Sequence, residues 1–81
     1  MARLVFLGRL ADIAGRAGEE WSVAAPLDWA GVLARLPQTL AEAVSQPKVR
    51  VALNGAVLAD KAALVLRDGD ELAFLPPVSG G

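Results

Sequence analysis

The sequence contains no cysteine and no histidine. The absence of cysteine excludes disulfide bridges, thiolate metal sites and a nucleophilic thiol. Histidine is the side chain that most often transfers protons near neutral pH, and it is also the commonest metal ligand. Without it, the hydroxyls of Ser22, Ser45 and Ser79 have no base that would activate them. We therefore expect a protein that is not a catalyst on its own.

The sequence also lacks an excess of positive or negative charge. The formal net charge is -1, charged residues make up 21% of the chain and hydrophobic residues 54%. This balance excludes a disordered chain and provides no field that would hold nucleic acid or an anionic membrane surface. The longest early apolar run, residues 4–7, is too short for a secretory signal or a membrane span. The sequence therefore predicts a cytoplasmic protein that binds neither nucleic acid nor membrane.

The 81 residues suffice for one small domain with a single core. Runs of β-forming residues and tight-turn signals, including Asn54-Gly55, predict strands at residues 3–7, 19–24, 49–53, 56–58 and 71–75. Apolar residues at helical spacing predict a turn at 9–15, a main helix at 28–36 and a second piece at 39–46. Asp28 and Thr39 are the expected N-caps of the two longer pieces. In the first turn, Leu10, Ile13 and Ala14 share the apolar side.

This order of elements predicts an α+β domain, with a mixed sheet of about five strands and the main helix and short helical turns on one face. Because side chains alternate between the faces of a strand, one set forms the core under the helix: Leu4, Phe6, Val49, Val51, Leu53, Leu72 and Phe74. The other set faces away: Arg3, Val5, Leu7, Arg50, Ala52, Glu71, Ala73 and Leu75. Bare apolar side chains ringed by charges are unusual on a solvent face, so this set predicts a partner-binding surface.

Other residues have simpler interpretations. Asp68 and Asp70 resemble a metal-binding pair, but turn chemistry explains them better because a divalent cation needs more ligands, and we predict no metal site. Lys48 and Lys61 are candidate conjugation targets, yet we expect both to be solvated. The two tryptophans, Trp21 and Trp29, lie on the apolar side of their elements and are predicted to be core residues.

The chain divides into a domain, residues 1–75, and an extended tail, residues 76–81, with the sequence Pro76, Pro77, Val78, Ser79, Gly80 and Gly81. Two prolines favour an extended chain, and the last two residues have no Cβ. A frayed terminus is the simple interpretation. The alternative is functional: a carboxylate at Gly81 can pass down a narrow channel that any side chain would block, and can be attacked there from either side.

The run from Asp68 to Gly81, DGDELAFLPPVSGG, together with LVFL at 4–7 and VALNG at 51–55, resembles a known family. It is similar to the small subunit of molybdopterin synthase, the ubiquitin-like sulfur carrier also called MoaD. The resemblance covers the whole chain in length and element order, and its specificity lies mainly in the tail and the strand before it. It implies a ubiquitin-like β-grasp fold, which agrees with the predicted order of elements.

The resemblance also implies a mechanism. An adenylating enzyme that resembles ubiquitin-activating enzymes uses ATP to convert the terminal carboxylate to an acyl-adenylate. Sulfur relayed from a cysteine desulfurase then gives a thiocarboxylate. The tail enters the large subunit of molybdopterin synthase, within an expected heterotetramer, and donates sulfur to a pterin precursor to build the dithiolene of molybdopterin. The carrier itself binds no cofactor.

Carried over to this sequence, the resemblance gives Gly81 the thiocarboxylate and places Pro76, Pro77, Val78, Ser79 and Gly80 in the tunnel. Leu7 and Leu75 stand where such carriers often have aromatic residues that dock the partner. The expected partner-binding residues are Leu7, Leu75, Arg3, Val5, Arg50, Val57 and Ala73.

Three alternatives remain open. The chain could carry sulfur for thiamin synthesis or tRNA thiolation, although thiamin-type carriers are usually shorter and seldom have the Pro-Pro pair. It could be a ubiquitin-like protein modifier that forms isopeptide bonds through the same glycine. It could also be an interaction module whose Gly-Gly end is incidental.

Overall fold

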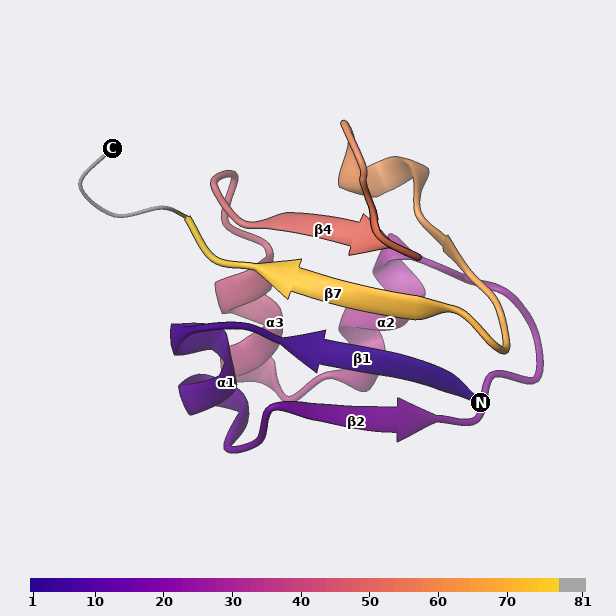
Figure 1. Ribbon diagram of the computed structural model, residues 1–81, viewed down its shortest axis with the longest axis horizontal. Helices are drawn as coiled ribbons and strands as arrows, with labels where there is room; N and C mark the ends of the chain where they lie inside the picture. The colour runs from indigo at the N-terminus through magenta and orange to yellow at the C-terminus, as the bar shows by residue number, and fades with distance from the viewer. Residues whose placement is uncertain (78–81) are drawn as a thin grey trace.

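Two parallel strands, one from each end of the chain, form the centre of the sheet (Figure 1). The computed structural model describes residues 1–77. Strand β1 (Ala2–Phe6) pairs in parallel with β7 (Glu71–Leu75), as the sequence predicts. The sheet order is β2-β1-β7-β4-β5, with the remaining pairs antiparallel. The other three strands are β2 (Gly18–Trp21) and β5 (Ala56–Val57) at the two edges and β4 (Arg50–Leu53) between β7 and β5.

Three short helices cover one face of this sheet (Figure 1). They are α1 (Arg9–Ala14), α2 (Trp29–Arg35) and α3 (Gln38–Val44). The Asp28 carboxylate accepts a hydrogen bond from the Gly31 amide at 2.8 Å and caps α2, as predicted. Thr39 is not the cap of α3, and that prediction is wrong: the helix begins at Gln38, directly after Pro37. Pro37 separates the two helices because its own backbone is extended, with ψ 146°.

The second strand is shorter than its sequence pattern indicates. It ends at Trp21, whose partner on β1 is Ala2, the first residue of that strand. The next residue is held elsewhere, since the Ser22 carbonyl accepts a hydrogen bond from Arg35 Nη1 at 2.9 Å. Trp21 and Val23 are nevertheless both buried, so the prediction of their inward orientation is confirmed.

The sequence pattern did not reveal three short elements, two of them between β5 and β7 and one directly before α2. The 3-10 helix η1 (Lys61–Ala63) leads into β6 (Val65–Leu66), which pairs with β3 (Leu27–Asp28) in a separate two-stranded sheet. Strands of two residues are too short to show alternation. The pairing buries Leu64 and Leu66 and closes the core at the end of α2.

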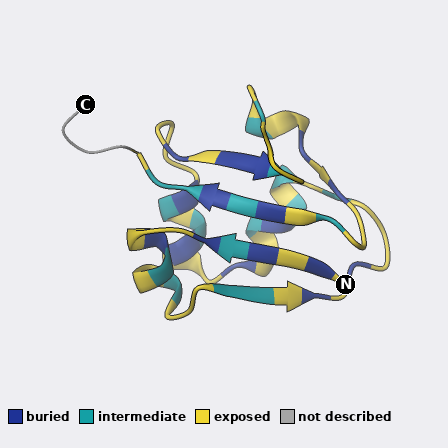
Figure 2. Ribbon diagram, in the orientation of Figure 1, coloured by how far each residue is buried: buried dark blue, intermediate teal, exposed yellow. Residues whose placement is uncertain are grey.

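The core lies between the sheet and the helices (Figure 2). Leu4, Leu72 and Phe74 are fully buried, and the rings of Phe6 and Phe74 stack with centroids 5.4 Å apart. The inward set predicted from parity is thereby confirmed, with Leu53 partly buried at its edge. Trp29 is half-buried, and its ring lies 6.3 Å from that of Phe74. None of the helices in residues 1–77 is long and apolar enough to cross a membrane.

Candidate functional site

The first two tail residues, Pro76 and Pro77, here called the tail root, follow directly after the end of β7. Pro76 is half-buried and Pro77 is exposed, and both continue away from Leu75 at the end of the central strand. Gly8, between β1 and α1, lies against this root: a Cβ placed on Gly8 would be 3.1 Å from Cγ of Pro76. The remaining tail residues, Val78, Ser79, Gly80 and Gly81, lie outside the described residues, so the roles predicted for them stay predictions.

The sheet face without helices, here called the open face, has an apolar row across four strands. Val5 is in register with Ala73, Ala73 with Ala52, and Ala52 with Val57. Exposure differs along the row: Val5 and Ala73 are half-buried, Ala52 is only 8% exposed, and Val57 on the edge strand β5 is 53% exposed. The predicted residues Val5, Ala73 and Val57 are therefore brought together on one surface.

The end of the open face nearest the tail carries the two leucines singled out by the sequence. Leu7 is 41% exposed and follows β1, and its amide donates to the Phe74 carbonyl at 3.3 Å, which places it beside Leu75. Leu75 is half-buried and in register with exposed Arg50 on β4. Leu7, Leu75 and Arg50 thus lie directly at the point where the tail leaves the domain.

The opposite end of the open face is charged. Exposed Arg3 is in register with Glu20 on β2 and with Glu71 on β7. The predicted residue Arg3 therefore lies between two carboxylates, far along the strands from Leu75. The open face changes from mixed charge at this end to apolar side chains and one cation at the tail.

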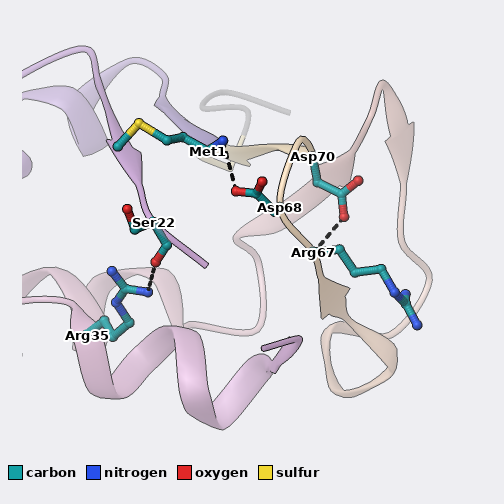
Figure 3. Close-up of polar contacts among 6 residues, drawn as sticks. All are labelled: Met1, Ser22, Arg35, Arg67, Asp68 and Asp70. Atoms are coloured by element: carbon teal, nitrogen blue, oxygen red, sulfur yellow. Dashed lines mark hydrogen bonds and ion pairs between the residues drawn. The ribbon is translucent and has the colours of Figure 1, made fainter. Parts of the chain in front are cut away.

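Both carboxylates of the Asp68-Gly69-Asp70 turn form contacts that hold the local structure (Figure 3). Asp68 forms an ion pair with the Met1 ammonium at 2.8 Å. Asp70 accepts hydrogen bonds from Asn54 Nδ2 at 3.0 Å and from the Arg67 amide at 2.8 Å. These hydrogen bonds, with that from Asn54 first in size, hold the pKa of Asp70 below its ordinary value. Within residues 1–77, no three acidic side chains gather in a way that could hold a metal ion.

Lys61 differs from the prediction that it would be solvated. Its ammonium donates to the carbonyls of Val44 at 3.0 Å and Gln46 at 2.8 Å, at the C-terminal end of α3, and lies 5.4 Å from the centroid of Trp29. Partial burial lowers the pKa of Lys61. Lysine at a helix C-terminus satisfies carbonyls that the helix leaves without a partner. Lys48 is exposed, as expected.

One feature near the tail was missed by sequence reasoning. A groove of about 170 Å³ lies between α1, α3 and the tail root. Ile13, expected on the buried side of α1, is 40% exposed and lines this groove instead. Helical spacing groups Ile13 with Leu10, but α1 has only six residues and its buried contact is made by Leu10. The sequence held no signal for the groove, because helical spacing places Ile13 on the same side as Leu10.

The comparisons with known proteins agree with this geometry. The sequence profile of the ThiS family matches residues 4–81. The chain belongs to this family of ubiquitin-like sulfur carriers. No curated protein sequence matches it.

Solved structures of this family's fold resemble the domain over almost its whole length. SAMP1 from Haloferax volcanii is 26% identical, with a TM-score of 0.75 over 99% of this chain and 98% of that one. A second Haloferax volcanii protein, HVO 2177, is 28% identical, with a TM-score of 0.76 over 99% and 85% of the two chains. A subunit in the complex of subunits 1 and 2 of the molybdopterin-converting factor from Helicobacter pylori is 24% identical, with a TM-score of 0.65 over 99% and 97%. The ubiquitin-like β-grasp fold expected from the sequence is thereby confirmed.

Proposed function

We propose that this sulfur carrier is the small subunit of a molybdopterin synthase and that Gly81 carries the sulfur as a C-terminal thiocarboxylate. The observation that carries the proposal is the position of the tail. It leaves the central strand at Pro76, directly beside the apolar end of the open face formed by Leu7 and Leu75. A partner that binds these leucines is in position to receive the tail in its own active site.

The chemistry follows from the leaving group. Carboxylate oxygen is a poor leaving group, so the Gly81 carboxylate attacks the α-phosphorus of ATP, forming an acyl-adenylate and releasing pyrophosphate. A persulfide sulfur then attacks the acyl carbon and AMP leaves. Reduction of the resulting disulfide linkage by a thiol releases the thiocarboxylate. ATP belongs to the adenylating enzyme and the persulfide is relayed from a cysteine desulfurase, so the carrier needs no bound cofactor or metal.

The synthase large subunit is the proposed recipient of the tail. The Helicobacter pylori neighbour is a complex of subunit 1 with subunit 2, which supports a partner of this kind. In the recipient, the thiocarboxylate sulfur attacks the pterin precursor, and hydrolysis of the acyl link returns the Gly81 carboxylate. The absence of side chains at Gly80 and Gly81 suits a narrow tunnel. The PPVSGG tail after DGDE favours molybdopterin synthesis over thiamin synthesis or tRNA thiolation.

A second candidate function is the covalent modification of other proteins. It is favoured by the likeness to SAMP1, whose second solved structure is described as that of a small archaeal modifier protein. The same acyl-adenylate serves both functions, because an amine that attacks the acyl carbon gives an isopeptide where sulfur gives a thiocarboxylate.

The intact mass of the protein separates these functions. The full chain is incubated with host lysate, ATP and cysteine beside a variant that lacks Gly81. A gain equal to the exchange of one oxygen for sulfur, seen only in the full chain, supports the carrier function, and transfer of that sulfur to a pterin with purified large subunit supports the pathway. Adducts of higher mass indicate the modifier. An unchanged mass, despite confirmed desulfurase activity and ATP turnover, contradicts the proposal.

A further inference from the structure

We propose that the groove between α1 and α3 is a second docking site for the protein that receives the tail, and that it takes an apolar side chain of that protein next to a carboxylate. The inference rests on the proposed function, because it requires a protein that encloses the tail. It adds a contact on the helix side of the sheet, opposite the open face.

The groove has an apolar floor and a polar rim. Its apolar lining consists of Leu10, Ile13, Ala43, Val49, Pro76 and Pro77. Leu10 and Val49 are core residues, with 2% and 3% of their surface exposed, and they form a fixed base. Arg9 and Gln46 supply polar groups at the margin. A volume of about 170 Å³ is of the size of one large apolar side chain.

Ile13 gives the groove its exposed apolar surface. It is 40% exposed on a six-residue helix whose contact with the core is already made by Leu10. Exposed apolar surface next to a pocket is typical of a contact site for another protein. The side chain is therefore available to a partner without any rearrangement of the core.

The groove is continuous with the proposed docking surface. Leu75 belongs to the open face, and the next two residues, Pro76 and Pro77, form a wall of the groove. Six residues, 76–81, span at most about 20 Å at ~3.3–3.6 Å per residue. The carrier domain must therefore lie close to the partner's active site while the tail is inside it. A protein that encloses the tail from its root contacts both sides of the root.

Charge defines the chemistry of the occupant. Arg9 lies at the groove and Arg50 lies beside Leu75 on the open face, so each side of the tail root has one cation. Within residues 1–77, neither guanidinium forms an ion pair. Both arginines are exposed and free to bind an acidic surface. An apolar side chain of the partner fills the groove, and an Asp or Glu next to it pairs with Arg9 at the rim.

Binding of full-length variants to the purified adenylating enzyme and to the purified synthase large subunit, measured by calorimetry, tests the inference. Ile13→Asp places a charge in the groove, and Arg9→Glu reverses the charge at its rim. We expect each variant to bind the synthase large subunit, which is the proposed recipient of the tail, about tenfold more weakly. Val65→Asp is the matched control, because Val65 is 39% exposed and lies on β6, outside the groove and the open face. Arg16→Glu controls for the change in net charge.

The possible outcomes distinguish a failure of the groove proposal from a failure of the proposed carrier function. Weaker binding of Ile13→Asp and Arg9→Glu, with unchanged melting temperatures and with both controls binding as the original protein does, supports the second docking site. Normal binding of both groove variants to the synthase large subunit, while Leu75→Arg binds it weakly, overturns the groove and leaves the carrier function standing. Failure of the original chain to form a thiocarboxylate or to bind either protein overturns the proposed function and the groove with it.

Discussion

Gly8 lies against Pro76 at the end of the sheet, so that a side chain at Gly8 would press on the proline ring. A Cβ there would lie 3.1 Å from Cγ of Pro76, and the Gly8 backbone has φ 54° and ψ -133°, a combination that glycine tolerates and other residues avoid. The loop between β1 and α1 therefore helps to set the direction in which the tail leaves β7. This packing joins the fold of the domain to the position of the tail root.

Replacement of Gly8 by alanine tests this role. We expect Gly8→Ala to lower the free energy of unfolding by at least ~1–2 kcal/mol from backbone strain and to slow thiocarboxylate formation in the folded fraction. Gly15→Ala is the matched control: Gly15 also has a positive φ, 77°, but nothing lies within 4 Å of a Cβ there. Urea unfolding and intact-mass kinetics measure the two effects. Equal loading rates for the two variants would show that the Pro76 contact does not orient the tail.

The apolar end of the open face makes a different prediction. We expect Leu75→Arg to weaken binding to the synthase large subunit by about tenfold or more, because it desolvates an added charge beside Arg50. Its effect on unfolding should stay near ~1 kcal/mol, since Leu75 is only half-buried. Val65→Arg serves as the control on an exposed valine outside the open face. Loss of folding with normal binding by the folded fraction would contradict the assignment of Leu75 to a docking surface.

Lys61 joins η1 to the end of α3, so its removal should affect stability. We expect Lys61→Met to lower the free energy of unfolding by about 1 kcal/mol, because two carbonyls lose a charged donor while the apolar stem is kept. Lys48→Met, at an exposed position, should change it by much less. Chemical denaturation of both variants measures the difference. Equal stabilities would mean that water replaces the ammonium without cost.

Asp70 predicts how stability responds to acid. Its pKa is lower in the folded domain than in the unfolded chain, so the unfolded chain takes up the proton first as the pH falls. The stabilisation is complete above the unfolded value of about 3.8 and is lost as the pH falls through the lower folded value. We expect the stability of Asp70→Asn to decrease less than that of the original protein between pH 6 and pH 2, while Asp12→Asn follows the original protein. Parallel pH profiles for all three would exclude a contribution from Asp70. Ordinary carboxyl groups titrate within this range of about four pH units.

Deletion of Gly81 should separate stability from reactivity. All residues that are buried in the described chain lie between Ala2 and Phe74, so the melting temperature should change little. Thiocarboxylate formation should be lost completely. Thermal unfolding and intact mass measure the two properties, and a fall of many degrees in the melting temperature would assign the tail a structural role.

The sequence predicted the parts of the molecule where a pattern repeats. Leu4, Phe6, Leu72 and Phe74 alternate along strands of five residues, and parity alone placed them in the core. Residues 27–28 and 65–66 pair over two positions, so no alternation exists to be read. Ile13 and Lys61 were misplaced because their environments depend on contacts between elements: Ile13 borders α3 and the tail root, and Lys61 reaches carbonyls at the end of α3. The residues of the open face followed from parity, whereas the groove required the tertiary arrangement of α1 and α3.

The position of β7 also has a consequence for the order in which the protein can fold. This strand is the last one in the chain, yet it fills the middle of the sheet between β1 and β4 (Figure 1). Until it is inserted, the β1–β2 pair and the β4–β5 hairpin have no strand to join them. Pairing of β7 with β1 must bring together residues from the two ends of the sequence. Such non-local pairing is a slow, late event in folding. A newly synthesised chain therefore gains its open face and the root of its tail in one step, when β7 is inserted.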